Sequence, residues 1–86
     1  MRAVADVPRL TLYSRYYCHL CDEMTATLTG LAGELGFELA ILDVDSDPAL
    51  EARFNELVPV LMHGDTELAR YRLDLQAVRA YLAQIR

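Results

Sequence analysis

The sequence predicts a single α/β domain with a four-stranded mixed sheet and helices on both faces. Three observations predict it: short apolar runs of strand length, stretches with apolar residues at helical spacing, and the order in which the two alternate along the 86 residues. A chain of this length forms one small domain. We assign residues 9–86 to that domain and expect residues 1–8 to form a frayed N-terminus.

The first half of the chain predicts a strand, a helix and a second strand. Residues 9–13 alternate in hydrophobicity around two leucines, which is typical of a strand. Residues 19–35 carry one apolar stripe at helical spacing, and Gly33 and Gly36 each offer a place for that helix to end. Residues 37–44 are almost continuously apolar, which is typical of a strand covered on both faces. The stripe of the helix consists of Met24, Leu28, Leu31 and Leu35.

The second half predicts a short helix, a hairpin and a final helix. Asp47 followed by Pro48 is typical of an N-cap and first helical position, so a short helix begins there. Residues 58–71 contain two extended runs around a tight turn at 63–65. The last helix is amphipathic, with apolar positions Leu75, Val78, Leu82 and Ile85. The complete order is βαβαββα, with the first strand expected in the middle of the sheet.

The only two cysteines, Cys18 and Cys21, follow the carboxyl end of the first predicted strand, where α/β sheets tend to place chemistry. A disulfide across so short a loop restrains the unfolded chain very little, so a structural role explains it poorly. If the helix begins near His19, unpaired N–H groups and the helix dipole favour a Cys18 thiolate and lower its pKa. The spacing therefore predicts a reversible redox pair with Cys18 as nucleophile, Cys21 as resolving thiol, and neither sulfur sealed in the core.

Neighbouring charges should influence Cys18 in both directions. Arg15 and a protonated His19 would stabilise the thiolate and are the residues expected to tune its pKa. Asp22 and Glu23 suit the first turn of a helix but oppose a nearby thiolate. We expect the helix start and Arg15 to prevail. The alternative is that Arg15 and His19 are simply exposed residues of the loop and helix.

These residues resemble the thioredoxin superfamily and, within it, the glutaredoxin-like branch. The resemblance rests on the strand, loop, C-x-x-C and helix written "LTLYSRYYCHLC", on "VPVL" some forty residues later, and on the order of the elements. It implies a thioredoxin fold, thiol–disulfide oxidoreductase activity as an electron carrier, and Pro59 in cis facing the cysteine pair. It further implies that Val58 and Pro59 position the substrate, along the Val58 backbone. The alternative is a trans proline that starts an edge strand.

The chain departs from the glutaredoxin pattern at the positions associated with glutathione. His19 and Leu20 replace the usual Pro-Tyr between the cysteines, and Ala69 and Arg70 replace two glycines. Arg72 stands near the position of an aspartate in the family. Asp74 could substitute for it, or could cap the last helix instead. We expect no cofactor. The expected enzyme acts on protein or small thiols and disulfides, and both glutathione and thioredoxin reductase stay open as its partners, with glutathione as reductant or substrate.

Composition excludes several classes of function. The net charge is −5 and all eight basic residues are arginines that form no cluster, which argues against nucleic acid as a partner. No apolar run approaches membrane length or resembles a secretory signal, so we expect no membrane association and a cytoplasmic location. In such a compartment, paired cysteines indicate catalysis or metal binding. We expect a monomer.

A metal site is one alternative for the cysteine pair. Cys18, His19, Cys21 and His63 could be counted as four ligands. Adjacent Cys18 and His19 would point apart at a helix start, and His63 is expected in the hairpin turn. A structural zinc site usually needs two ligand pairs, and this chain has one. We therefore expect no metal.

A second alternative is a thioredoxin-fold binding or scaffold module without redox turnover. The tyrosines Tyr13, Tyr16, Tyr17 and Tyr71 could form a surface that grips a partner, or could be partly buried with their hydroxyls in water. Tyr16 and Tyr17 lie beside Cys18 in the loop. They are the better candidates for contact, and we include Tyr17 with Arg15 among the expected substrate-binding residues.

Overall fold

The computed structural model describes residues 7–85, and the predicted βαβαββα order is present. Two short 3-10 turns, η2 and η3, flank the second helix. The elements are β1 (Arg9–Ser14), α1 (His19–Leu35), β2 (Glu38–Asp43), η2 (Val44–Ser46), α2 (Pro48–Phe54), η3 (Asn55–Leu57), β3 (Val60–His63), β4 (Thr66–Arg70) and α3 (Leu75–Ile85). Within this described part, no helix is long and apolar enough to cross a bilayer.

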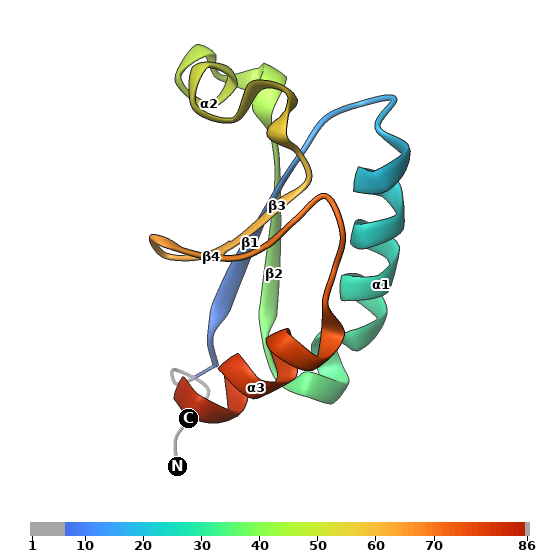
Figure 1. Cartoon of the computed structure of the whole chain (residues 1–86), viewed down its shortest axis with the longest axis vertical. Helices are drawn as coiled ribbons and strands as arrows, with labels where there is room; N and C mark the ends of the chain where they lie inside the picture. Colours follow the sequence, from blue (N-terminus) through green and yellow to red (C-terminus); the bar gives the residue numbers. More distant parts are fainter. Residues whose placement is uncertain (1–6, 86) are drawn as a thin grey trace.

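The four strands form one mixed sheet in the order β2-β1-β3-β4. β1 pairs in parallel with β2 and antiparallel with β3, and β3 and β4 form a hairpin. β1 therefore lies inside the sheet, as predicted. The loop that leaves its carboxyl end rises to the start of α1, at the same end of the molecule as α2 (Figure 1). α3 crosses the opposite end.

Two apolar clusters pack on the two faces of the sheet. The cluster under α1 and α3 comprises Leu10, Leu12, Met24, Leu28, Phe37, Leu61, Val78 and Leu82. The cluster under α2 comprises Cys21, Val44, Phe54, Val58, Val60 and Met62. Side chains alternate between faces along a strand, so Leu12 of β1 enters the first cluster and the next residue, Tyr13, packs against the second. This arrangement confirms helices on both faces of the sheet.

Local capping explains where the helices begin and end. Gly36 ends α1 in a left-handed conformation (φ 75°), and its N–H donates to the Ala32 carbonyl at 2.9 Å, whereas Gly33 lies within the helix. Asp47 caps α2 by accepting from the Ala49 N–H at 2.9 Å. Asp74 caps α3 through the Ala77 N–H at 3.2 Å. The sequence predicts all three of these ends.

β2 corrects one prediction, because it is an edge strand and is not covered on both faces. Ile41 and Leu42, which point to opposite faces of the sheet, are 46% and 41% exposed. Among residues 7–85, only β1 pairs with this strand, and the short α2 lies at one end of the sheet (Figure 1). A run of apolar residues predicts a strand but does not say whether the strand is central or at an edge.

His63 is also placed differently from the prediction, since it is the last residue of β3 and the turn consists of Gly64 and Asp65. Gly64 adopts φ 59°, which lets two residues close the hairpin. The His63 side chain faces Tyr81 of α3, with Nδ1 2.6 Å from the tyrosine hydroxyl. This contact ties the hairpin to the last helix.

The expected frayed segment 1–8 lies mostly outside the described residues, as does residue 86 of the expected domain 9–86. Of the two described residues in that segment, Pro8 accepts a hydrogen bond from the Glu38 N–H at 2.8 Å. The pairing between β1 and β2 therefore extends one residue before β1.

Candidate active site

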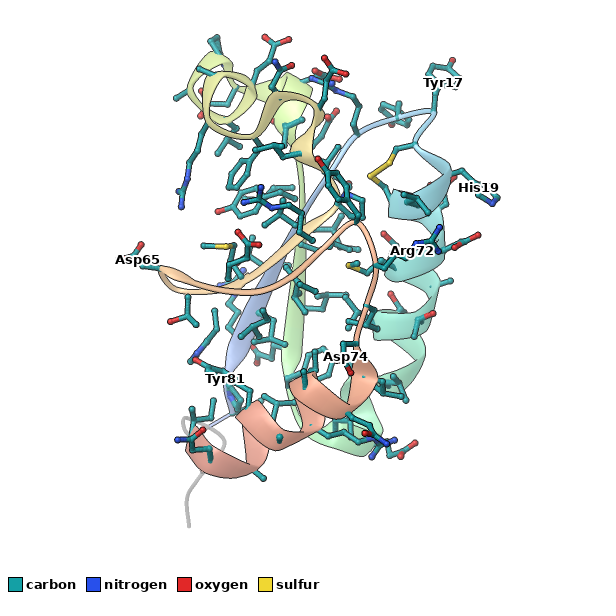
Figure 2. The ribbon with its side chains drawn as sticks, in the orientation of Figure 1. Tyr17, His19, Asp65, Arg72, Asp74 and Tyr81 are labelled. Carbon is teal, nitrogen blue, oxygen red and sulfur yellow. A yellow bond between two sulfur atoms is a disulfide. The ribbon has the colours of Figure 1, made fainter. Side chains whose placement is uncertain are left out.

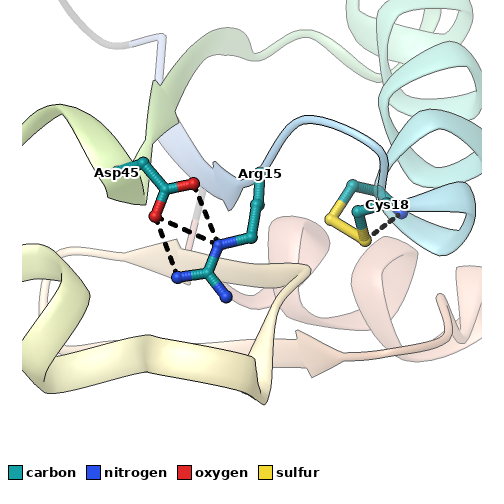
Figure 3. Close-up of a disulfide and its surroundings, with 4 residues drawn as sticks. Arg15, Cys18 and Asp45 are labelled. Atoms are coloured by element: carbon teal, nitrogen blue, oxygen red, sulfur yellow. Dashed lines mark hydrogen bonds and ion pairs between the residues drawn. A yellow bond between two sulfur atoms is a disulfide. The ribbon is translucent and has the colours of Figure 1, made fainter.

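Cys18 and Cys21 are joined by a disulfide at the start of α1, with their Cα atoms 5.1 Å apart (Figure 3). Cys18 is the N-cap residue, with extended backbone angles (φ −109°, ψ 105°), and its Sγ accepts from the Cys21 N–H at 3.1 Å. Because an N-cap residue is not bound to helical angles, its side chain can turn back toward the first turn. This is how two cysteines three positions apart come within bonding distance.

The two cysteines differ in their access to solvent. Cys18 is half-buried, whereas Cys21 is only 1% exposed and belongs to the core cluster under α2. The expectation that neither sulfur is sealed in the core is therefore wrong for Cys21, because the first turn of α1 packs against that cluster. A molecule that approaches from solvent meets Cys18 first.

Arg15 is held by carboxylates of the η2–α2 region. Its Nε lies 3.2 and 3.1 Å from the two carboxylate oxygens of Asp45, and its Nη2 lies 2.9 Å from Oδ1 of the same group. Glu51 is 3.8 Å away. The hydrogen bond with Asp45 raises the pKa of the Arg15 guanidinium. Figure 3 shows the side chain turned toward Asp45, so its positive charge is already compensated and its effect on Cys18 stays a prediction.

His19 lies on the outer side of α1, and 86% of its side chain is exposed (Figure 2). Its Nε2 is 2.8 Å from the Glu23 carboxylate, one helical turn further on. This pair occupies the first turns of α1 together with Asp22, which is also exposed. The role of His19 in tuning Cys18 stays a prediction.

The peptide bond between Val58 and Pro59 is cis. Both residues are buried, and Val58 shares the core cluster of Cys21, so the structure brings this segment to the cysteine pair. The Pro59 carbonyl accepts from the Tyr71 N–H at 2.9 Å. The segment is thereby tied to the connection between β4 and α3.

The four tyrosines do not form one surface. Tyr13 stacks on Phe54 with 4.2 Å between ring centroids, so it belongs to the packing under α2. Tyr16 is 78% exposed and Tyr17 is fully exposed, both in the loop before Cys18. Tyr71 is 41% exposed and directly follows β4. Tyr17 and Tyr71 adopt positive φ angles of 59° and 66°, which are uncommon for tyrosine.

The sequence does not predict two features of this region. One is a pair of grooves that flank the first turns of α1, and the other is the ion pair between Arg15 and Asp45. One groove, of about 320 Å³, lies between α1 and the β4–α3 connection, and the other, of about 310 Å³, lies between α1 and β2. Asp45 is thirty positions from Arg15, and no local pattern pairs them. In residues 7–85, no group of three or more His, Cys, Asp or Glu side chains could hold a metal ion.

The comparison with known proteins agrees with this arrangement. Residues 9–83 match the profile of the glutaredoxin-like domain family. Uncharacterized proteins of Mycobacterium tuberculosis and Mycobacterium bovis are 30% identical over 82 residues, covering 90% of this chain and 84% of theirs. A Nitrosomonas europaea protein solved by NMR is 37% identical, covers 94% of this chain and 98% of its own, and superposes with a TM-score of 0.75.

More distant structures share the fold alone. Thioredoxin 1 from Thermosipho africanus is 16% identical with a TM-score of 0.63, covering 88% of this chain and 96% of its own. A buckwheat glutaredoxin solved as a glutathione complex is 19% identical with a TM-score of 0.55, covering 95% and 78%. The architecture is thus that of the thioredoxin fold, as predicted.

Proposed function

The chain belongs to the glutaredoxin-like domain family, and from this membership we propose that it is a thiol–disulfide oxidoreductase that carries electrons through Cys18 and Cys21. One observation supports the proposal above others: a half-exposed cysteine caps a helix and is disulfide-bonded to a buried cysteine beside the Val58–Pro59 segment. An exposed sulfur can meet a substrate, and a buried neighbour can complete the exchange.

The helix start supplies the activation of the nucleophile. In the reduced protein, the Cys21 N–H that lies 3.1 Å from Sγ in the disulfide form is placed to donate to the Cys18 thiolate. Unpaired N–H groups and the dipole of α1 add to this stabilisation. We therefore expect the pKa of the Cys18 thiol to lie below its ordinary value of about 8.5.

The exchange proceeds in two nucleophilic displacements at sulfur. The Cys18 thiolate attacks one sulfur of a substrate disulfide, which forms a mixed disulfide and releases the other substrate sulfur as a thiolate. The Cys21 sulfur, after losing its proton, attacks Cys18 within the mixed disulfide and releases the second substrate thiolate. The substrate gains two electrons, and the enzyme is left with the Cys18–Cys21 disulfide.

A thiol reductant must then return two electrons to the enzyme. Either two glutathione molecules or the dithiol of a thioredoxin reductase could do so, and we propose these as the two classes of reductant. A reducing compartment such as the cytoplasm suits this cycle, because it keeps such a pair reducible. We propose a monomer in which Arg15, Tyr17, Val58 and Pro59 surround the substrate.

The test is a redox titration. The protein is equilibrated in buffers of graded glutathione to glutathione-disulfide ratio, and free thiols are counted by alkylation and mass spectrometry. We expect a reversible loss of two thiols together over a defined range of potential. A pair that cannot be reduced, or that stays reduced in fully oxidising buffer, would overturn the proposal.

A binding module without turnover is the second candidate, and the exposure of Tyr16 and Tyr17 favours it. Aromatic side chains in a loop provide contact area at small entropic cost. This candidate predicts a partner that binds equally well to the wild type and to a Cys18→Ser, Cys21→Ser double variant. The oxidoreductase predicts that the double variant exchanges no disulfide.

A further inference from the structure

The larger groove begins beside the cysteine pair and follows α1. One wall comes from α1 with Leu20, Glu23 and Met24, and the other comes from the β4–α3 connection with Tyr71, Arg72 and Leu73. Leu20 directly precedes Cys21, and the Tyr71 N–H is bonded to the Pro59 carbonyl. Both walls therefore start at segments that surround the disulfide, and a chain bound to Cys18 can extend into the groove.

Tyr71 is held in a strained backbone conformation at the rim of this groove. It is the central residue of a γ-turn, because the Arg72 N–H donates to the Arg70 carbonyl at 2.7 Å, and its φ is 66°. γ-Turns with a positive central φ are rare and strained. Such conformations persist where the surrounding structure imposes them, and they gather at ligand-binding sites. The turn directs the next residue, Arg72, toward α1 (Figure 2).

The cation of Arg72 is not compensated within the described structure. Arg15, Arg70 and Arg79 each have a carboxylate within 4.0 Å. Arg72 has none that close anywhere in residues 7–85, which is also true of Arg9 and Arg53, but of these three only Arg72 lines the groove. Glu23, the carboxylate that lines the same groove, has its oxygen 2.8 Å from His19 on the outer side of the helix.

The groove offers a carboxylate good conditions for binding this arginine. A guanidinium binds a carboxylate through two parallel hydrogen bonds, as Arg15 binds Asp45 in the same molecule. The apolar side chains of Leu20, Met24 and Leu73 line the same groove and can contact the aliphatic part of an acidic side chain. An acidic group is therefore the ligand that matches the unpaired charge.

Resting on the oxidoreductase function proposed above, we propose that Arg72 is a specificity-determining residue that receives an acidic side chain of a protein substrate. The length of the groove limits how far, in sequence, the acidic residue can lie from the substrate cysteine. Thr27, the lining residue furthest along α1, follows Cys18 by nine residues, or about 14 Å along a helix. An extended chain covers about 3.3 Å per residue, so an acidic residue that reaches this groove lies within about four positions of the substrate cysteine.

The test compares matched peptides. Each peptide carries one cysteine in a disulfide with a chromogenic thiol, and Glu, Gln or Lys at the second and third positions on either side of it. Release of the chromophore by the reduced protein measures the rate constant of exchange. For the wild type we expect the Glu peptides to react about fivefold faster than the Lys peptides, the factor expected for one ion pair of about 1 kcal/mol.

Two charge reversals separate a local effect from a general one. Arg72→Glu should reverse the order so that the Lys peptides react faster, and Arg72→Gln should abolish the preference. Arg9→Glu makes the same change in net charge at the far end of β1, six residues and about 20 Å from the active-site loop. It should leave the preference intact. Arg72 and Arg9 are both exposed, so circular dichroism should show each variant folded.

The possible outcomes distinguish the two proposals. If the wild type exchanges all peptides at equal rates, the role of Arg72 is wrong and the oxidoreductase stands. If no peptide reacts, the oxidoreductase itself fails. If Arg9→Glu changes the preference as much as Arg72→Glu does, the effect is one of net charge and the role of Arg72 is overturned. The same holds if Arg72→Glu slows glutathione disulfide alone and leaves the peptide preference unchanged.

Discussion

The Arg15 guanidinium grips the Asp45 carboxylate with two nitrogens, Nε at 3.1 Å and Nη2 at 2.9 Å, across thirty positions of sequence. Arg15 lies in the loop that leads to Cys18, and Asp45 lies in η2. The pair therefore connects the loop before Cys18 to the η2 turn that follows β2. It also neutralises the cation that would otherwise be available to Cys18.

We predict that Arg15→Gln affects the stability of the fold more than the acidity of Cys18. Losing the pair should move the denaturation midpoint slightly to lower urea concentration, because an exposed ion pair contributes little to stability. The pKa of the Cys18 thiol should change little, because Asp45 and Glu51 already offset the charge of Arg15. Urea denaturation and the pH dependence of alkylation measure the two quantities.

Arg79→Gln is the matched control for that variant, since Arg79 pairs with Glu34 at 3.4 Å between α3 and α1. It should lower stability by a similar or smaller amount and leave the Cys18 pKa unchanged. A rise of a full pKa unit in Arg15→Gln would instead show that Arg15 acts directly on the thiolate.

We predict that the two cysteines respond differently to substitution. Cys21→Ser should accumulate a stable mixed disulfide at Cys18, because the attack on the substrate needs only Cys18. Cys18→Ser should react with substrate disulfides at least about a hundredfold more slowly, since Cys21 is 1% exposed. Intact-protein mass spectrometry after mixing with glutathione disulfide identifies the adduct. An adduct on Cys21 as abundant as that on Cys18 would contradict the assignment.

The acidity of Cys18 can be measured in the same Cys21→Ser variant. The rate of iodoacetamide alkylation should rise with pH and reach half its maximum below about 8.5, because the helix start stabilises the thiolate. Protonation below that midpoint should remove the activity with the same profile. A midpoint at or above the value of a free cysteine would show that the N-cap position of Cys18 does not activate it.

We predict that Tyr17→Gly retains or raises stability. Tyr17 is fully exposed, and its φ is 59°. Glycine stabilises the fold by removing the cost of a left-handed tyrosine, about 1–2 kcal/mol. It also destabilises the fold by about 0.5–1 kcal/mol, because it raises the conformational entropy of the unfolded state. Tyr17→Val should lower stability, because a β-branched residue resists this conformation. If Tyr17 contacts the substrate, both variants should slow exchange with peptides, and the Tyr17→Asn control should slow it without loss of stability.

We predict that Asp74→Ala lowers the free energy of unfolding by about 1 kcal/mol. The Asp74 carboxylate accepts from the Ala77 N–H at 3.2 Å and caps α3. Asp74→Asn should retain most of that stability, because an amide oxygen can accept the same bond. If neither variant changes the denaturation midpoint but both slow glutathione exchange, Asp74 is a substrate residue rather than a cap.

Features that depend on nearby residues follow from the sequence, and features that depend on distant ones do not. The ends of α1, α2 and α3 are predictable, because Gly36, Asp47 and Asp74 act on backbone groups within a few positions of themselves. The pairing of Arg15 with Asp45 depends on how the strands bring separate segments together. No local pattern carries that information.

Burial was also hard to predict from local patterns. The apolar run of β2 looks like a central strand, but strand order places it at the edge, with Ile41 and Leu42 exposed. The C-x-x-C pattern does not indicate which of Cys18 and Cys21 is buried. Cys21 becomes a core residue because the first turn of α1 packs against the cluster under α2.

The seclusion of Cys21 has a consequence for oxidative damage. If Cys18 and Cys21 form the redox pair that we propose, a peroxide arriving from solvent would meet Cys18 first and convert it to a sulfenic acid, with Cys21 beside it. Condensation of the sulfenic acid with the Cys21 thiol would expel water and form the disulfide, a state from which Cys18 is not oxidised further to the irreversible acids. The buried Cys21 would thus protect Cys18 from irreversible oxidation, and a thiol that reduces the disulfide would restore the protein.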